Sequence, residues 1–274
     1  MIRLAVRCGP AAAERVLGEL LELAPGGVEE ESGPGWVEYA IYGAPGELPE
    51  LGSVDAVAGE EPIEVSSAEV PDDWADRWQD FHEPVWIAGR VLVRPSWREA
   101  SSRAEVEVVI DPGQAFGTGA HPTTRMCIEM LVGLADHGDA TGSAADLGTG
   151  SGVLAIVAAK LGFGPVLAVD HELAALEAAR ENAEANGVAL ELSRLNLREQ
   201  PPPDAETVVA NLTAPLLRAL AERLTEADRP RGLLCSGLLA REANEVSSAF
   251  ADAGFAQARR LDSGDWVAIA FARS

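Results

Sequence analysis

The sequence is short of cysteine, histidine and long apolar runs, and each shortage excludes a class of protein. Its three cysteines, Cys8, Cys127 and Cys235, are scattered and form no CxxC pair, so a disulfide framework is not expected. The four histidines show no ligand spacing with one another or with the cysteines. We therefore expect no metal site, and cysteines that are reduced and mostly buried.

Membrane and assembly signals are also scarce. No window holds the roughly 18 uninterrupted apolar residues that a membrane helix needs. Residues 1–7 alternate like a strand and do not form the apolar run of a signal peptide. No heptad pattern or large apolar tail calls for assembly. A cytoplasmic monomer without membrane association is expected.

Positive charge is scarce as well. The 21 basic residues, of which Lys160 is the only lysine, oppose 44 acidic residues, so the formal net charge is −23. Binding to a phosphate backbone rests on clustered Lys and Arg, so direct contact with nucleic acid is not expected. Residues 1–70 carry three arginines against fourteen acidic residues. That segment could steer a cationic protein toward the molecule, although acidic surfaces also serve solubility alone.

The first part of the chain predicts a small α+β domain over residues 1–68. Hydrophobic alternation and helical periodicity occur in the order strand, helix, strand, strand, helix, strand, which is the ferredoxin-like order. The predicted strands lie at 2–8, near 28, at 36–41 and near 63, and the predicted helices lie at 11–23 and near 47.

A linker helix is predicted over residues 69–84. Trp74, Trp78 and Phe81 lie on one face of it at spacings of four and three. Three large aromatic side chains on one stripe could form a binding platform. Packing between two domains is the commoner arrangement, and it is the interpretation favoured here.

Residues 85–274 predict an α/β domain with a doubly wound, mostly parallel sheet, because strand and helix patterns alternate regularly. Two final strands joined by a short loop predict an antiparallel hairpin at one end of that sheet. The predicted strands are 90–94, 105–110, 144–147, 166–170, 189–193, 207–211, 232–236, 255–261 and 266–271, and the predicted helices are 122–134, 152–161, 172–185, 214–224 and 239–253.

A glycine-rich loop follows the strand at 144–147. In DLGTGSG, residues 146–152, the glycines allow a tight turn while N–H groups at the next helix start face a ligand. Twenty-two residues after Gly148 the next strand ends in Asp170, where a carboxylate can accept both ribose hydroxyls. Val153 occupies the position of the third glycine of a dinucleotide fingerprint, which disfavours NAD or FAD. The alternative is that the glycines only ease strand–helix packing.

The GxGxG spacing with an acidic end of the second strand resembles the S-adenosylmethionine site of class I methyltransferases. That resemblance makes Asn211, at the carboxyl end of the fourth strand, the candidate catalytic residue. In-line methyl transfer needs a neutral amine held about 3 Å from the methyl carbon, and an amide oxygen can accept the N–H bonds of that amine. No general base stands out. Asn211 could instead only contact the cofactor, or serve as a turn residue.

A second motif is more specific. Residues 112–125, PGQAFGTGAHPTTR, look like the signature loop of the ribosomal protein L11 methyltransferase family, whose general form is PGxAFGTGxHxTT. The resemblance extends over about residues 70–274. It departs from the family at Asp265, where Glu is usual, and at Asn196, where Asp is common near an adenine edge.

The resemblance implies a class I methyltransferase that uses S-adenosylmethionine, releases S-adenosylhomocysteine, and methylates lysine side chains and the N-terminal amine of L11. It implies that Thr124, Gly148, Asp170 and Asn211 bind the cofactor and that residues 116–119 close over it. His121, in the same loop, is interpreted as a capping or packing residue. The full set of expected cofactor contacts is Phe116, Gly117, Thr118, Gly119, Thr123, Thr124, Asp146, Gly148, Gly150, Gly152, Asp170 and Asn211.

Residues 1–68 would recognise L11, an inference that rests on the resemblance and on their acidity. One rival is a class I methyltransferase acting on another protein amine or amide, such as a release-factor glutamine. Its marker, Asn-Pro-Pro-Tyr, is replaced here by the sequence NLTA at 211–214. Another rival is a non-catalytic ribosome-associated binding module, against which the intact glycines, Asp170 and Asn211 argue.

Overall fold

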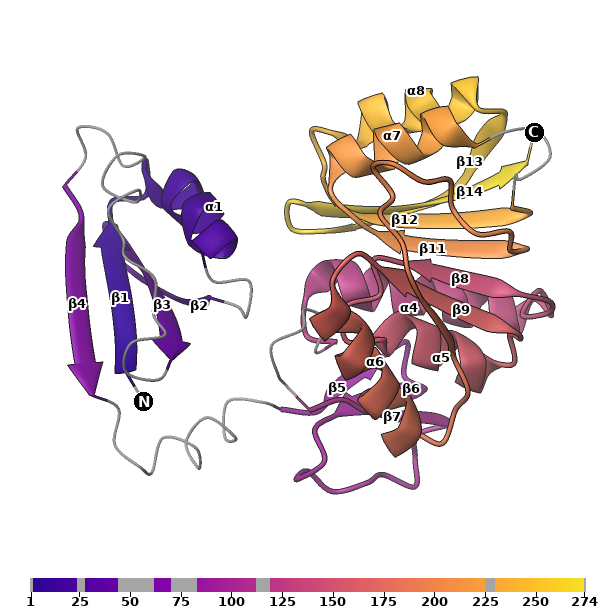
Figure 1. Ribbon diagram of the computed structural model, residues 1–274, viewed down its shortest axis with the longest axis horizontal. Helices are drawn as coiled ribbons and strands as arrows, with labels where there is room; N and C mark the ends of the chain where they lie inside the picture. The colour runs from indigo at the N-terminus through magenta and orange to yellow at the C-terminus, as the bar shows by residue number, and fades with distance from the viewer. Residues whose placement is uncertain are drawn as a thin grey trace. The chain divides into compact units, whose positions relative to one another are not determined.

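The computed structural model describes residues 2–23, 28–43, 62–69, 83–111, 119–224 and 230–273. These residues divide into two compact units, one up to Glu69 and one from Glu83 onward (Figure 1). The linker helix predicted over 69–84 falls almost wholly on residues 70–82, which lie outside the described residues. Glu69 itself is the last residue of a strand.

The first unit contains a four-stranded antiparallel sheet in the order β2-β3-β1-β4. This is the strand arrangement of a ferredoxin-like domain, while the second helix predicted near residue 47 lies outside the described residues. One face of the sheet packs against α1, where Val16 and Leu20 are buried with Val6 and Tyr39. The elements are β1 (Ile2–Cys8), α1 (Ala13–Leu23), β2 (Glu29–Gly33), β3 (Trp36–Gly43) and β4 (Glu64–Glu69).

On the face of the sheet that points away from α1, side chains of β1 and β3 form an ion cluster. Arg3 places a guanidinium nitrogen 2.8 Å from Oε1 of Glu38, and Arg7 places one 2.8 Å from Oε2 of the same carboxylate. The hydrogen bond from Arg3 is the main reason that the pKa of Glu38 lies below its ordinary value. Arg7 also lies over the ring of Trp36, 4.3 Å from its centroid. The exposed strand β2 beside this cluster carries three consecutive glutamates.

The second unit contains a seven-stranded sheet in the order β10-β9-β8-β11-β12-β14-β13. Pairs from β10 to β12 are parallel and β14 is antiparallel to both neighbours, so the predicted doubly wound sheet with a closing hairpin is confirmed. The strands are β8 (Ala144–Leu147), β9 (Val166–Asp170), β10 (Glu191–Arg194), β11 (Thr207–Asn211), β12 (Gly232–Leu239), β13 (Phe255–Ser263) and β14 (Trp266–Arg273).

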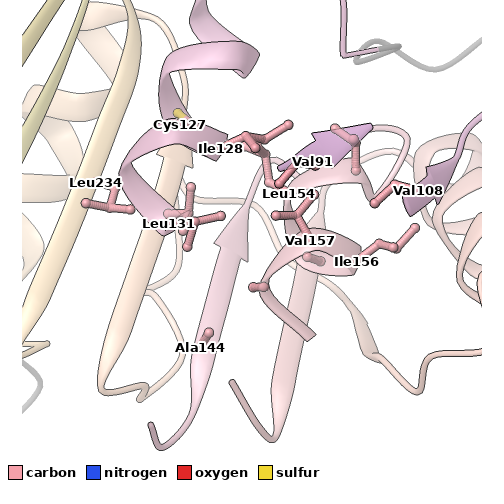
Figure 2. Close-up of a cluster of buried hydrophobic side chains, with 14 of the residues drawn as sticks. Val91, Val108, Cys127, Ile128, Leu131, Ala144, Leu154, Ile156, Val157 and Leu234 are labelled. Atoms are coloured by element: carbon pink, nitrogen blue, oxygen red, sulfur yellow. The ribbon is translucent and has the colours of Figure 1, made fainter. Parts of the chain in front are cut away.

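Helices cover both faces of this sheet, as the near-continuous apolar strands require. Helices α4, α5 and α6 contribute to a core on one face, and α7 and α8 contribute to a core on the other (Figure 1). Figure 2 shows the first core, in which Ile128 and Leu131 of α4 meet Leu154 and Val157 of α5. The helices are α4 (Pro122–Asp136), α5 (Val153–Leu161), α6 (Leu173–Ala185), α7 (Ala214–Arg223) and α8 (Ala243–Asp252).

A small three-stranded sheet extends the first core. Its order is β5-β6-β7, and Val91 and Val108 from it are fully buried against α4 and α5 (Figure 2). Its strands are β5 (Val85–Ile87), β6 (Val91–Arg94) and β7 (Val106–Val109). Within the described ranges, no helix has the length and apolarity that crossing a membrane would take.

Most predicted bounds agree closely with the structure, but one prediction was wrong. The fifth parallel strand was predicted to stop at residue 236 and a helix to begin at 239, whereas β12 continues to Leu239 and α8 begins at Ala243. Gly237 adopts φ 82°, and the pairing with β14 shifts its register between Cys235 and Leu238. The strand therefore bulges and then resumes its pairing.

Candidate functional site at the carboxyl edge of the large sheet

Several of the predicted site residues that the structure describes meet at one edge of the seven-stranded sheet. Strand β8 lies between β9 and β11, and both pairings are parallel. The carboxyl ends of these three strands therefore carry the glycine loop, Asp170 and Asn211 to the same edge. This is where doubly wound folds place their ligands.

The glycine loop is held by main-chain hydrogen bonds to β9. The N–H groups of Gly148 and Thr149 donate to the carbonyl of Val169 at 2.9 and 3.0 Å. Gly148 has φ 72°, and a Cβ at this position would lie 2.5 Å from Cδ2 of Leu212. The positive φ favours glycine there, and any side chain would also require Leu212 to move.

The end of the same loop fixes α5 against α6. Gly152 is the N-terminal cap of α5 and has φ 82°. A Cβ on Gly152 would lie 3.0 Å from Cβ and 3.1 Å from Cα of Ala179 in α6. At Gly152, therefore, the close packing of α5 against α6 leaves little room for a side chain.

Asp170 is oriented by two backbone donors. Its Oδ2 accepts the N–H of Gly150 at 3.0 Å and its Oδ1 accepts the N–H of Glu172 at 3.1 Å. The ring of His171 places Nδ1 3.3 Å from Oδ1. A carboxylate offers about four acceptor directions, so these contacts leave Asp170 with capacity for hydroxyl groups of a ligand.

Asp146 is the most buried carboxylate of this edge, with 2% of its surface exposed. Its Oδ2 accepts hydrogen bonds from the hydroxyl of Thr149 at 2.6 Å and from the N–H of Ala155 at 3.2 Å. Its Oδ1 is buried and has no hydrogen-bond partner among the described residues. Desolvation raises the pKa of Asp146 to about 6, and the nearby charge of Asp170 adds to this effect.

Asn211 presents a second unpaired acceptor. Its Nδ2 donates to the hydroxyl oxygen of Thr124 at 3.4 Å, which links β11 to the start of α4. Its Oδ1 is buried and, like Oδ1 of Asp146, finds no donor in the part of the chain that the structure describes. A buried acceptor without a donor is costly, so two of them at neighbouring strand ends indicate a ligand that brings N–H groups or positive charge.

The two threonines at the start of α4, Thr123 and Thr124, make different contacts. His121 caps the helix, with Nδ1 2.7 Å from the hydroxyl of Thr123 and 3.4 Å from its N–H. Burial lowers the pKa of His121, and its ring meets the edge of Trp266 with centroids 4.9 Å apart. The prediction that His121 caps or packs is confirmed. Thr124, rather than Thr123, contacts Asn211.

The signature loop is described only at its end. Gly119 has φ 86°, and a Cβ there would lie 2.8 Å from Cγ1 of Val93, so the loop returns closely against β6. Phe116, Gly117 and Thr118 lie outside the described residues. Their predicted closure over the cofactor therefore stays a prediction.

Sequence reasoning missed Gly237. Its Cα approaches the backbone of Leu212 so closely that a Cβ would lie 2.5 Å from the carbonyl oxygen of that residue. A glycine inside a strand pattern is a known sign of a bulge or a close backbone approach. That signal was present in the sequence at Ser236-Gly237 but does not name the partner.

Two of the cysteines belong to the second unit, Cys127 in α4 and Cys235 in β12, and Cys8 belongs to β1 of the first unit. All three are free and buried. Burial raises the pKa of both Cys127 and Cys235, so they stay protonated. Across the described ranges, no group of three or more His, Cys, Asp or Glu side chains could hold a metal ion.

Comparisons with known proteins identify the family of this chain. The family described as ribosomal protein L11 methyltransferase (PrmA) matches residues 51–274. A ribosomal protein L11 methyltransferase of Shewanella pealeana is 44% identical over 183 residues, which cover 66% of this chain and 61% of that protein. One of Pelotomaculum thermopropionicum is 40% identical over 203 residues, which cover 73% and 65%. The chain thus spans less than two thirds of the length of these relatives.

A solved structure supports the same conclusion. The crystal structure of a ribosomal protein L11 methylase from Lactobacillus delbrueckii subsp. bulgaricus superposes with a TM-score of 0.62 at 28% identity. The match covers 70% of this chain and 99% of that one. With the family match over most of the chain and the class I methyltransferase fold, the chain belongs to the ribosomal protein L11 methyltransferase family.

Proposed function

We propose that this chain transfers methyl groups from S-adenosylmethionine to amines of ribosomal protein L11, at lysine side chains and the N-terminal amine. The observation that carries the proposal is the pair of unpaired, buried acceptors, Oδ1 of Asp146 and Oδ1 of Asn211. They lie at the ends of adjacent strands, beside a carboxylate suited to ribose. Family membership supports both the reaction and the acceptor.

The residues present fit S-adenosylmethionine. The ammonium and sulfonium groups of the cofactor are cationic. The unpaired oxygen of Asp146 supplies a negatively charged acceptor for the ammonium group. Asp170 retains acceptor capacity for the ribose hydroxyls. The loop from Gly148 to Gly152 supplies close backbone approach. When bound, the cofactor supplies an activated methyl group on sulfur.

Asn211 orients the acceptor amine. Its Nδ2 is engaged by Thr124, so its Oδ1 is left to accept an N–H bond from the amine and aim the nitrogen lone pair. The carbonyl of Leu212, the next residue, is proposed as a second acceptor, and among the described backbone groups outside helices and strands no N–H donates to it. A lysine amine must be neutral to react, and burial beside apolar side chains lowers its pKa.

No described histidine serves as a general base in this proposal. Nδ1 of His121 is engaged with Thr123 at the start of α4. The amine therefore gives its proton to solvent before the site closes. The chain then contributes binding, orientation and exclusion of water.

Recognition of L11 is assigned to the first unit, residues 1–68, and the methyltransferase domain to residues 85–274. The exposed acidic strand β2 supports this division, because it offers charge complementary to a basic protein. A monomer acting in the cytoplasm, without nucleic acid, is the form proposed.

The experiment is incubation of the purified chain with S-adenosylmethionine and recombinant L11, followed by peptide mass spectrometry. We expect mass gains of whole methyl units on lysines and the N-terminal residue. Asn211→Ala should lower turnover by roughly 100-fold through loss of orientation, while Asn244→Ala, on the exposed face of α8, should leave it unchanged. Cofactor binding without transfer to L11 would point to another acceptor. Absence of cofactor binding would instead support a non-catalytic module.

A further inference from the structure

We infer that Gly237 is a positioning residue for the acceptor amine, because it packs against the backbone of Leu212, which carries one proposed acceptor oxygen and directly follows Asn211, whose side chain carries the other. The inference rests on the proposed function of this edge. Gly237 lies on β12, 26 positions after Asn211 in the sequence. Sheet pairing between β11 and β12 brings the two segments together.

The first step is the closeness of the approach. A Cβ on Gly237 would lie 2.5 Å from the oxygen, 2.8 Å from the carbon and 2.9 Å from the nitrogen of Leu212. All three atoms belong to the backbone, so no side-chain rotation could relieve the contact. Gly237 also has φ 82°, a backbone conformation that residues with a side chain rarely adopt.

The second step is that Leu212 is held from two sides. Its N–H donates to the carbonyl of Ser236 at 3.0 Å, immediately before Gly237. Its side chain fills the space over Gly148, where a Cβ would lie 2.5 Å from Cδ2. Displacing the Leu212 peptide would therefore move the carbonyl of Leu212 and the adjoining amide of Asn211 together.

The third step is that the strand holding Gly237 is itself anchored. The hydroxyl of Ser236 donates to the carbonyl of Val267 at 2.9 Å, across the register shift between β12 and β14. Bulges commonly re-aim a backbone segment beside an active site. Here the bulge presents Gly237 to Leu212, away from the Asp170 carboxylate and its backbone donors.

These contacts predict a selective defect. Gly237→Ala should lower kcat on L11 by about 10- to 100-fold, because small displacements of a reacting group cost this much. The Kd for S-adenosylhomocysteine should change by much less than kcat, because Asp146, Asp170 and the Gly150 N–H keep their places.

Matched glycine variants separate positioning from general backbone strain. Gly264→Ala tests positive φ alone, because Gly264 has φ 58° in the β13–β14 turn and has nothing within 4 Å of its Cβ position. Gly232→Ala tests substitution in the same strand β12, again in open space. Both controls should keep wild-type kcat.

A readout without L11 keeps this inference separate from the choice of substrate. Sinefungin, an S-adenosylhomocysteine analogue, carries an amine where the cofactor carries its methyl group, so that amine reports on the acceptor oxygens. Wild-type protein should prefer sinefungin to S-adenosylhomocysteine, and Gly237→Ala should reduce this preference about tenfold by calorimetry. If wild-type protein keeps that preference but does not methylate L11, the substrate assignment fails and the positioning role stands.

A second variant covers the case in which Gly237→Ala does not fold. Ser236→Ala removes the anchor to Val267 without adding an atom, and it should lower kcat and the sinefungin preference by about three- to tenfold. Circular dichroism and thermal melting establish folding for each variant. An unchanged sinefungin preference in the folded variants, or an equal loss of affinity for both ligands, would overturn the inference.

Discussion

Asp146 combines burial with an unpaired oxygen, and this has consequences for stability. Its pKa of about 6 lies above the value near 3.8 of an unperturbed aspartate. The folded state thus holds this proton more tightly than the unfolded chain. The contribution to stability is complete below about pH 4 and is lost as pH rises through 6.

Replacement of this carboxylate should therefore stabilise the protein at neutral pH. Asp146→Asn should raise the free energy of unfolding at pH 7.5 by about 1 to 3 kcal/mol in the absence of cofactor, because no buried charge remains. At pH 4 the gain should largely vanish. Urea denaturation at both pH values measures the difference, and an equal effect at the two would contradict the assigned pKa.

The same group predicts how cofactor affinity depends on pH. The ammonium group of the cofactor favours the ionised carboxylate, so affinity should fall as pH drops below about 6, by up to tenfold per unit. Calorimetric titration with S-adenosylhomocysteine from pH 5 to 8 gives the profile. Asp146→Asn should bind more weakly at pH 7.5 and show a flatter profile, whereas a profile as steep as wild type would assign the dependence to another group.

At the scale of single residues, the sequence predicted those parts of the site whose residues lie close together along the chain. The loop at 146–152 and Asp170 fall within one strand-helix-strand stretch, so their positions follow from the pattern. The link from Asn211 to Thr124 spans 87 positions, and the approach of Gly237 to Leu212 depends on strand order. The partner in neither contact could be identified from local sequence, although Gly237 itself signals a bulge or a close backbone approach.

Among the elements, the junction of α5 and α6 offers a direct test of packing. Gly152→Ala should destabilise the protein by about 2 to 3 kcal/mol, because the new methyl meets the backbone of Ala179 and the residue keeps positive φ. Gly187→Ala, with φ 65° and open space, should cost only about 1 kcal/mol. Chemical denaturation of both variants makes the comparison, and equal losses would show that φ alone matters.

The elements of the large sheet could be predicted because buried strands and amphipathic helices alternate with clear turns. Strand β11 is buried on both faces, and its apolar run gave the correct bounds. The continuation of β12 to Leu239 could not be predicted, because its pairing with β14 resumes beyond a bulge. A glycine at that point normally weakens a strand pattern.

For the whole molecule, charge is the property that governs encounter. With a net charge of −23, association with a basic protein should slow as ionic strength rises. The double change Glu30→Gln and Glu31→Gln on exposed β2 should slow association at low salt more than Glu199→Gln with Glu222→Gln, which makes the same charge change on the second unit. Stopped-flow rates over a salt series test this, and a flat series would exclude steering.

The position of the only lysine has a consequence for self-modification. Lys160 lies in the last turn of α5, whereas the glycine loop precedes the first turn of the same helix. The end of α5 is followed by Gly164, whose N–H donates to the carbonyl of Gly142 just before β8. Lys160 thus belongs to the opposite edge of the sheet from the glycine loop. The site proposed to methylate lysines therefore does not reach Lys160, so incubation with S-adenosylmethionine alone should leave Lys160 unmethylated by intact-mass analysis.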